Sequence, residues 1–459
     1  MQVTENSNWV QQQFELCQLG DKRRTKRVCK MAMTMLDSPH DSLPTQSETW
    51  SDLKAAYRWC AQDDVTFDAV ATPHWKQTQQ TKPGRFLLIS DTTDIDHFSH
   101  NATAGLSQLG NGSGRGVQLH SCLVVEAEEK VVTGTAGAVL NYRVSTSKKE
   151  TRAARLKRRR ESEIWGEVVN QVGVPPEGSQ WIHVFDRGGD NFEAMCHIVL
   201  QQSDWIIRAA KMQRNVMNTE GNKLPLSKAI EETETLGSYT LSLRARPGQS
   251  ARDATIEVST CKVSFPQPYL RSQFVKDCGI ELIEMNVVIV QEVATPDGVK
   301  PIRWVLLTSL PVESFEAAWE IIEFYECRWL IEEYHKVLKT GCQIEQHSLR
   351  EASRLEPLIA LISVIGVRLL QLKTIARHAP DQSAKGRVPR SWLKTLKAMR
   401  PRLRKKELTV YEFFRELAKL GGFIGRKSDG EPGWQTTWRG YQKLHATLLG
   451  MKLANNNCG

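Results

Sequence analysis

Apolar residues recur at helical spacing in two short segments near the start of the chain. One segment predicts a helix from about Lys22 that ends before Pro39, with an apolar stripe formed by Val28, Met31, Ala32, Met35 and Leu36. The segment SDLKAAYRWCAQ predicts a second helix, capped at Ser51 or Asp52. The turn-rich sequence CAQDDVTF follows it, so we expect a small helical domain over residues 1–66.

Beyond Pro83-Gly84 the spacing changes from helical to strand-like. The apolar run RFLLIS predicts a buried strand with Asp91 at its tip, and WIHVF predicts another that ends in Asp186. Between them, residues 117–127 and 130–144 alternate like an antiparallel hairpin, and a basic helix is predicted from about Arg152 to Val172. DWIIRAAK predicts a further strand, at residues 204–211.

Residues from about 215 to 300 alternate again and predict a β-rich insertion. The apolar strand IRWVLLTSLPV closes this insertion, and a long helical region follows it. Hairpin strands followed by β-α-β alternation predict an α/β fold with a mixed sheet flanked by helices. We place this domain at residues 67–375 and a second small helical domain at residues 376–459.

Composition places the chain among globular proteins. Its 459 residues are 40% hydrophobic and 25% charged, which excludes collagenous, disordered and multi-spanning membrane proteins. The first residues do not resemble a signal peptide, and the longest apolar stretch, 358–367, is too short to cross a bilayer. We therefore expect a cytoplasmic protein with no membrane partner.

Positive charge is concentrated in three segments, residues 22–30, 148–160 and 385–406, which hold 24 of the 61 lysines and arginines. The net charge is +9. Such clusters neutralise phosphates, and three of them favour a nucleic-acid partner over solvated helix faces. In the first domain the candidate DNA contacts are Arg23, Arg24, Arg27, Lys54 and Arg58.

Acidic residues follow two predicted strands and recur in one helix. Aspartates at strand ends bind magnesium or manganese when several converge, but Asp91 or Asp186 alone is ordinary turn chemistry. In YECRWLIEEYHKVLKTG, four residues share an arc of about 60° on an ideal helix: Tyr325, Arg328, Glu332 and Lys339. Spacing alone leaves open whether this stripe is a surface salt-bridge ladder or a functional face.

The order of three acidic blocks, ISDTT, FDRGGD and YECRWLIEEYHKVLKTG, resembles that of the bacterial cut-and-paste DDE transposases of the insertion-sequence-four superfamily, above all those of the Tn-five type. Further counterparts run nearly from end to end and include LGDKRRTKR, AAYRW, RGVQLHS, RESEIW and LGGFIGRKSDGEPGW. The resemblance implies a ribonuclease-H-like core with a β-rich insertion. It also implies that Asp91, Asp186 and Glu332 are catalytic and bind two divalent metal ions, Mg²⁺ with Mn²⁺ as substitute.

The resemblance also implies DNA contacts around these carboxylates. Tyr325, Arg328 and Lys339 match residues that hold phosphates near the cleaved end, and Trp304 matches a tryptophan that stacks on a flipped base. Core packing is the alternative for Trp304. Three basic residues after the third strand are expected to meet the DNA backbone, with a solvated loop as the alternative: Arg208, Lys211 and Arg214.

Two features depart from the family pattern or match it less closely. Gly188 and Gly189 replace an acidic-alanine pair, so the loop after Asp186 is expected to be more flexible. The segment 385–406 matches poorly, and a C-terminal dimerisation helix is implied by LGGFIG and the residues after it.

The function implied by the resemblance is that of a transposase. Such a protein binds terminal inverted repeats as a homodimer, excises its element through hairpin ends and joins it to target DNA. The alternatives are an inert DNA-binding regulator and a structure-specific nuclease of the same fold. No nucleotide is expected, because no Gly-Lys-Ser/Thr follows the glycine-rich segment GNGSGRG, residues 110–116.

Overall fold

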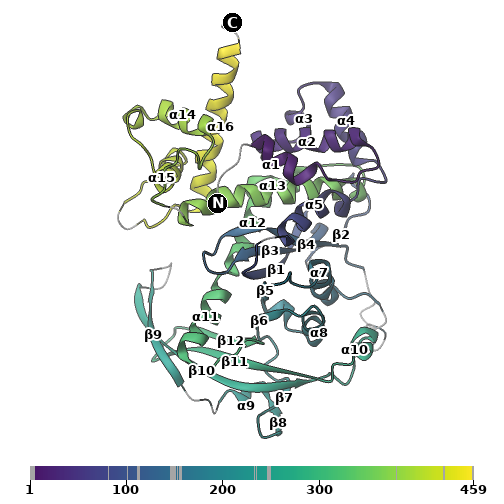
Figure 1. Cartoon of the computed structure of the whole chain (residues 1–459), viewed down its shortest axis with the longest axis vertical. Helices are drawn as coiled ribbons and strands as arrows, with labels where there is room; N and C mark the ends of the chain where they lie inside the picture. The colour runs from purple at the N-terminus through teal and green to yellow at the C-terminus, as the bar shows by residue number, and fades with distance from the viewer. Residues whose placement is uncertain are drawn as a thin grey trace.

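The computed structural model describes residues 6–80, 82–100, 102–110, 114–144, 151, 154, 158–231, 233, 235–245, 250–378, 380–426 and 429–456. Helical regions at both ends of the chain lie together, above a large mixed sheet (Figure 1). The predicted mixed α/β architecture with terminal helical regions is therefore confirmed. Parts of the glycine-rich segment, residues 111–113, and of the second basic cluster, residues 148–150, 152–153 and 155–157, lie outside the described residues.

The N-terminal region consists of the helices α1 (Asn6–Phe14), α2 (Lys22–Asp37), α3 (Leu43–Gln46), α4 (Trp50–Cys60) and α5 (Phe67–Gln79). The buried residues of α2 are the five of its predicted apolar stripe. The predicted cap of α4 was wrong, because Thr49 is the N-cap and its hydroxyl accepts a hydrogen bond from the backbone of Asp52. Helix α1 was not predicted.

A single sheet contains all twelve strands that the described residues form. They are β1 (Arg85–Asp96), β2 (Ser107–Gln108), β3 (Arg115–Glu126), β4 (Val132–Asn141), β5 (Gln180–Phe185), β6 (Asp204–Arg208), β7 (Asn215–Met217), β8 (Lys223–Pro225), β9 (Thr235–Leu243), β10 (Arg252–Pro266), β11 (Leu282–Val293) and β12 (Arg303–Thr308). The order is β2-β3-β1-β5-β6-β12-β11-β10-β7-β8, with β4 beside β3 and β9 beside β10. Among these strands of the described residues, β1–β5 and β5–β6 are the parallel pairs.

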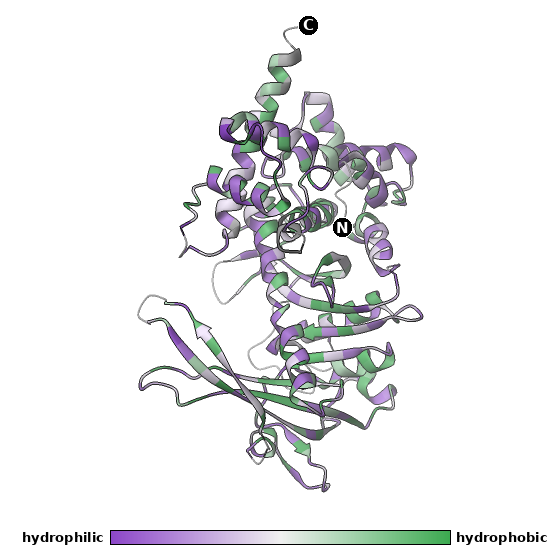
Figure 2. Ribbon diagram, turned by 60° about the vertical axis from the view of Figure 1, so that its left-hand side comes forward, coloured by the Kyte–Doolittle hydropathy of each residue, from purple (hydrophilic) through white to green (hydrophobic). Residues whose placement is uncertain are grey.

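The predicted hairpin is β3–β4, and the predicted β-rich insertion supplies β7 to β11. The insertion continues the central sheet, because β12 pairs with both β11 and β6. Its strands sweep away from the core as a curved ribbon, whereas apolar residues line the central strands (Figure 2). The short helices α9 (Leu226–Ala229) and α10 (Gln273–Asp277) belong to the insertion.

Helices α7 (Ile164–Val172) and α8 (Phe192–Leu200) cover one side of the central strands. The predicted basic helix is interrupted: among its described residues Ala154 is helical, residues 158–160 are not, and the chain is helical again from the 3-10 turn Glu161–Glu163 into α7. After β12 the chain forms α11 (Phe315–Glu326), α12 (Trp329–Lys336), a π-helical turn (Val337–Gly341) and a 3-10 turn (Ile344–Gln346).

Helix α13 (Ala352–His378) joins the three regions, since it contacts α2, α4 and α5, strand β4 and helix α15. Within the described part of the chain, its segment Ala352–Leu372 is long and apolar enough to cross a membrane by length and composition. This apolar segment is longer than the stretch recognised in the sequence. Nearly all of it is buried inside the protein, as in the core helix of a globular protein.

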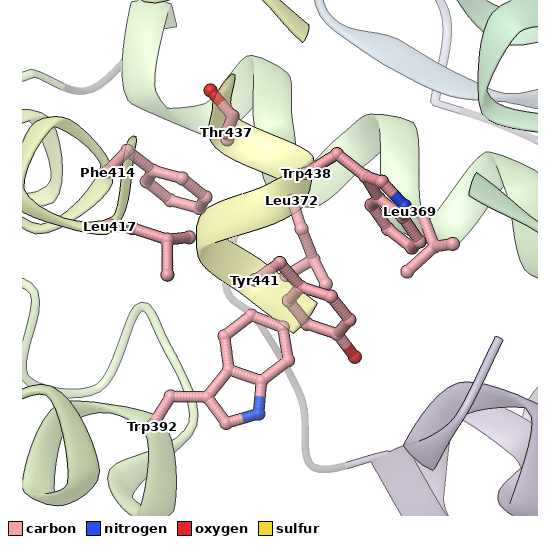
Figure 3. A pocket seen from close by; sticks show the side chains of 8 residues that line it. All are labelled: Leu369, Leu372, Trp392, Phe414, Leu417, Thr437, Trp438 and Tyr441. Atoms are coloured by element: carbon pink, nitrogen blue, oxygen red, sulfur yellow. The ribbon is translucent and has the colours of Figure 1, made fainter. Parts of the chain in front are cut away.

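The C-terminal region contains α14 (Arg390–Met399), α15 (Val410–Leu420) and α16 (Trp434–Asn456), with a 3-10 turn at Pro401–Leu403. Side chains from α13 to α16 form a small apolar pocket (Figure 3), lined by Leu369, Leu372, Trp392, Phe414, Leu417, Thr437, Trp438 and Tyr441. The Tyr441 hydroxyl donates a hydrogen bond to the backbone oxygen of Leu36, 3.1 Å away. Helix α16 is thereby tied to α2 of the N-terminal region.

Candidate active site and nucleic-acid interface

Asp91 and Asp186 lie where the pairing of β1 with β5 ends. The parallel pairing of β1 with β5 ends at Ser90 and Phe185, and the two aspartates are the next residues on the two strands. Asp91 is not at a strand tip, as the sequence predicted, because β1 continues to Asp96 in antiparallel pairing with β3. At Asp91 the pairing of β1 with β5 has ended, while the pairing of β1 with β3 continues. The Asp91 carboxylate therefore lies where β1 and β5 separate.

The loop after Asp186, which was expected to be more flexible because of its glycines, forms a 3-10 turn, Arg187–Gly189. The Asp186 carboxylate caps this turn by accepting a hydrogen bond from the Gly188 backbone, 2.7 Å away. A Cβ on Gly189 would lie 2.6 Å from the Phe185 side chain. Glycine is therefore needed for close packing, and the turn fixes one oxygen of Asp186.

The third carboxylate comes from helix α12, which packs against β1. An Arg328 guanidinium nitrogen lies 2.7 Å from a Glu332 oxygen, and another lies 3.5 Å from an Asp91 oxygen. The single helical arc assumed from the sequence is interrupted, because α11 ends at Glu326 and α12 begins at Trp329. Arg328 lies at this break and connects Asp91 with Glu332.

The other two carboxylates act electrostatically on Asp91. The pKa of Asp91 is raised from 3.8 to about 6, chiefly by burial and also by the negative charges of Asp186 and Glu332. The Thr92 backbone N–H, 2.7 Å from Asp91 Oδ1, and the Arg328 guanidinium act in the opposite direction. A carboxylate whose charge is opposed by two neighbouring acids is typical of a functional site.

Trp304 and Tyr325 form an aromatic wall beside Arg328. Their ring centroids lie 5.3 Å apart in an edge-to-face arrangement, and Arg328 lies 6.0 Å from the Tyr325 ring. Tyr325 is buried and Trp304 half-buried. Burial raises the pKa of Tyr325, whereas the nearby Arg328 and Arg208 lower it. Arg208 thus belongs to this cluster, and it also donates a hydrogen bond to the Arg303 backbone.

Lys339 lies further along, in the π-helical turn, and pairs with Glu345 at 3.2 Å. A Glu345 oxygen also accepts a hydrogen bond from the backbone of Asp96, at the end of β1. The structure therefore links Lys339 to the strand of Asp91 through Glu345, which was not singled out in the sequence.

Arg214 is engaged inside the protein. It pairs with the buried Asp190 at 2.7 Å and lies 4.7 Å from the Phe265 ring. Asp190 also accepts hydrogen bonds from the backbones of Ala210 and Lys211, so it holds the loop after β6, and the Lys211 side chain is exposed. Sequence reasoning missed Asp190, although the second aspartate of FDRGGD was a visible signal.

The N-terminal basic residues differ in their surroundings. Arg24 pairs with Asp64 at 2.8 Å and Arg27 with Asp52 at 3.1 Å, so both are partly neutralised. Arg23 is largely exposed beside Asp21. The exposed residues Lys54 and Arg58 lie on successive turns of α4, with the Lys54 ammonium 5.2 Å from the Trp50 ring.

Asp91, Asp186 and Glu332 are all carboxylates, and carboxylate oxygens are the type of donor atom that hard divalent cations prefer. Throughout the described ranges, however, no group of three or more acidic, histidine or cysteine side chains is arranged to hold a metal ion. The Arg328 guanidinium forms ion pairs with two of these carboxylates, Asp91 and Glu332.

Comparison with protein families identifies both ends of the chain. Residues 6–65 match a family described as transposase DNA-binding, and residues 364–458 match the transposase Tn5 dimerisation domain. The first match lies within the predicted domain 1–66, whereas the second begins inside α13, before the predicted boundary at 376. The matches support DNA and a second copy of the chain as partners. By the domains at its two ends, the chain resembles a Tn5-like transposase that binds DNA.

Proposed function

We propose that the chain is a cut-and-paste DDE transposase with a ribonuclease-H-like core. The observation that carries this proposal is the convergence of Asp91, Asp186 and Glu332 at the point where β1 and β5 part. This acidic site lies between a transposase DNA-binding match and a Tn5 dimerisation match. The central strands support such a core, because three of them, β1, β5 and β6, are parallel neighbours flanked by antiparallel β3 and β12.

Asp91, Asp186 and Glu332 would hold two divalent ions, Mg²⁺ or Mn²⁺ as substitute. When bound, such a pair activates the attacking oxygen and stabilises the leaving oxygen of a phosphodiester exchange. Arg328 and Arg208 provide positive charge near the carboxylates, and Lys339 provides it beside Glu345; these residues would hold the scissile strand. Trp304 provides a half-exposed aromatic surface for a displaced base.

The proposed reaction begins with nicking at each terminal inverted repeat. The freed 3′ hydroxyl attacks the opposite strand and forms a hairpin, hydrolysis opens the hairpin, and the 3′ hydroxyls then attack target DNA. Each transfer exchanges one phosphodiester bond for another, so no nucleotide is consumed. The hairpin step is supported by the family resemblance alone. A dimer is expected because two ends must be cut and joined together.

The test is cleavage of linear DNA that carries both ends of the element. We expect wild-type protein with Mg²⁺ to release the fragment between the ends and to leave hairpin termini, and the Asp186→Ala variant to release none. Asp94→Ala is the control, because Asp94 is a carboxylate on β1, the strand of Asp91, but accepts a hydrogen bond from Gln118. Specific binding of the ends without cleavage in Mg²⁺ or Mn²⁺ would favour the inert regulator. Cleavage of the DNA without end recognition or joining would favour a nuclease.

A further inference from the structure

Arg328 occupies the space between two of the three carboxylates. Its guanidinium lies 3.5 Å from Asp91 and 2.7 Å from Glu332, and its side chain is only 17% exposed. The position is set locally, because the Arg328 backbone donates to the Tyr325 carbonyl where α11 gives way to α12. A fixed positive charge thus lies among the oxygens that are proposed to bind metal.

We propose that Arg328 is an internal counter-ion that competes with the divalent cations for Asp91 and Glu332, and that a DNA phosphate releases it. The inference rests on the proposed function for the identity of the metal site. It adds to that function a coupling between DNA binding and metal binding, with Arg328 as the residue through which the two are linked.

The competition follows from charge and geometry. Asp91 and Glu332 must give up their ion pairs with the guanidinium before their oxygens can all face a cation, and a retained guanidinium would repel the incoming ion. Asp186 makes no ion pair with Arg328, and one of its oxygens is held by Gly188. The barrier to metal binding is therefore concentrated at the two carboxylates that Arg328 connects.

A phosphate is a suitable alternative partner for Arg328, because a guanidinium binds phosphate oxygens through two parallel hydrogen bonds. Arg208 adds positive charge on the Tyr325 side of Arg328. A DNA strand that reached these residues would withdraw Arg328 from the carboxylates and leave them free. Because binding couplings are reciprocal, bound metal would in turn increase the affinity for DNA.

The test measures Mn²⁺ affinity of the full-length protein by the electron paramagnetic resonance signal of free Mn²⁺, without DNA. We expect Arg328→Gln to bind Mn²⁺ roughly tenfold more tightly than wild type, which is the order expected from losing hydrogen bonds between charged groups. Lys336→Gln is the matched control. It removes one positive charge from the same helix, but Lys336 lies over the Trp329 ring and makes no ion pair with the three carboxylates.

A second measurement adds a short DNA duplex, corrected for the Mn²⁺ that the duplex binds alone. DNA is expected to tighten Mn²⁺ binding severalfold in wild type and to have little effect in Arg328→Gln. If Arg328→Gln does not fold, Arg328→Lys serves instead. It keeps the charge but cannot bridge both carboxylates, so its Mn²⁺ affinity is expected to exceed that of wild type.

The outcomes separate the inference from the function on which it rests. Wild-type binding of Mn²⁺ that depends on Asp186 but is not tightened by the Arg328 variants would overturn the counter-ion role and leave the proposed function standing. Equal tightening in Lys336→Gln would show a general charge effect and would also overturn it. Failure of every variant to bind Mn²⁺, with and without DNA, would overturn the metal site together with the inference.

Discussion

Asp91 and Asp186 occupy equivalent positions on neighbouring parallel strands, one residue beyond the last pair, Ser90 and Phe185. Neither aspartate can change its place without a shift of the sheet register, because β1 and β5 pair over six consecutive positions. The spacing of the two carboxylates is therefore a property of the backbone.

If Asp91 and Asp186 act on the same reaction centre, the effects of substituting them on the activation free energy of cleavage should not be additive. Asp91→Asn and Asp186→Asn are each expected to lower the rate of metal-dependent strand cleavage by at least about 10³-fold, and the double variant should be little worse than either. The measurement is single-turnover cleavage of labelled end DNA. Equal affinity of all three variants for the DNA would show that binding is intact, and losses that multiply in the double variant would contradict a shared centre.

Substitutions of Trp304 can distinguish a role of its ring in core packing from a role in stacking on a base. Its ring packs edge-to-face on Tyr325, a contact worth about 1 kcal/mol, yet it remains half-exposed. We expect Trp304→Phe to retain the melting temperature within a few degrees and Trp304→Ala to reduce hairpin formation about tenfold or more, since stacking contributes about 1–3 kcal/mol per base. A large loss of stability with unchanged hairpin yield would assign Trp304 to the core.

The hydrogen bond from Tyr441 to Leu36 is expected to stabilise the contact between α16 and α2. In Tyr441→Phe the buried Leu36 carbonyl loses its donor, which should cost about 1–2 kcal/mol of unfolding free energy. Hydrogen exchange of the α2 and α16 backbones would locate the effect. Thr447→Val is a suitable control, because the exposed Thr447 hydroxyl donates only within its own helix. Unchanged exchange in α2 would contradict the contact.

Local patterns predicted local structure well. The apolar stripe of α2 was identified residue by residue, because a helix that packs on one side must repeat its apolar residues every three or four positions. The strands that precede Asp91 and Asp186 were identified for a similar reason: they are short runs of buried apolar residues.

Relationships between distant segments could not be predicted in this way. Arg24 pairs with Asp64 in the turn after α4, and Arg27 pairs with Asp52 in α4, so the sequence overstated the free positive charge of the N-terminal region. The break at Arg328 also has no signal in periodicity, and neither does the contact of this residue with Asp91, which comes from a distant strand. The family resemblance supplied the grouping of Asp91, Asp186 and Glu332, which spacing alone could not.

From the surroundings of His74 we predict that acid weakens the contact between the N-terminal helices and the sheet. Its Nε2 accepts a hydrogen bond from the Thr135 backbone, 3.0 Å away, and its Nδ1 faces the Gln13 amide oxygen, so the ring is held neutral. Burial lowers the pKa of His74 from 6.5 to about 4. The unfolded chain therefore takes up a proton at higher pH than the folded chain does.

This difference fixes the sign of the pH dependence. The contribution of neutral His74 to stability is fully present above pH 6.5 and is lost as the pH falls from 6.5 through about 4, by up to about 3 kcal/mol. His74→Gln lacks the ring that makes these buried hydrogen bonds, so its unfolding free energy in urea should lie below that of wild type at pH 7.5. Because glutamine cannot titrate, the difference in unfolding free energy between the two proteins should narrow by about 1–2 kcal/mol at pH 5. Other buried histidines, such as His183, also have a lowered pKa but are common to both proteins, so the difference isolates His74. Parallel pH profiles for the two proteins would show that His74 does not contribute.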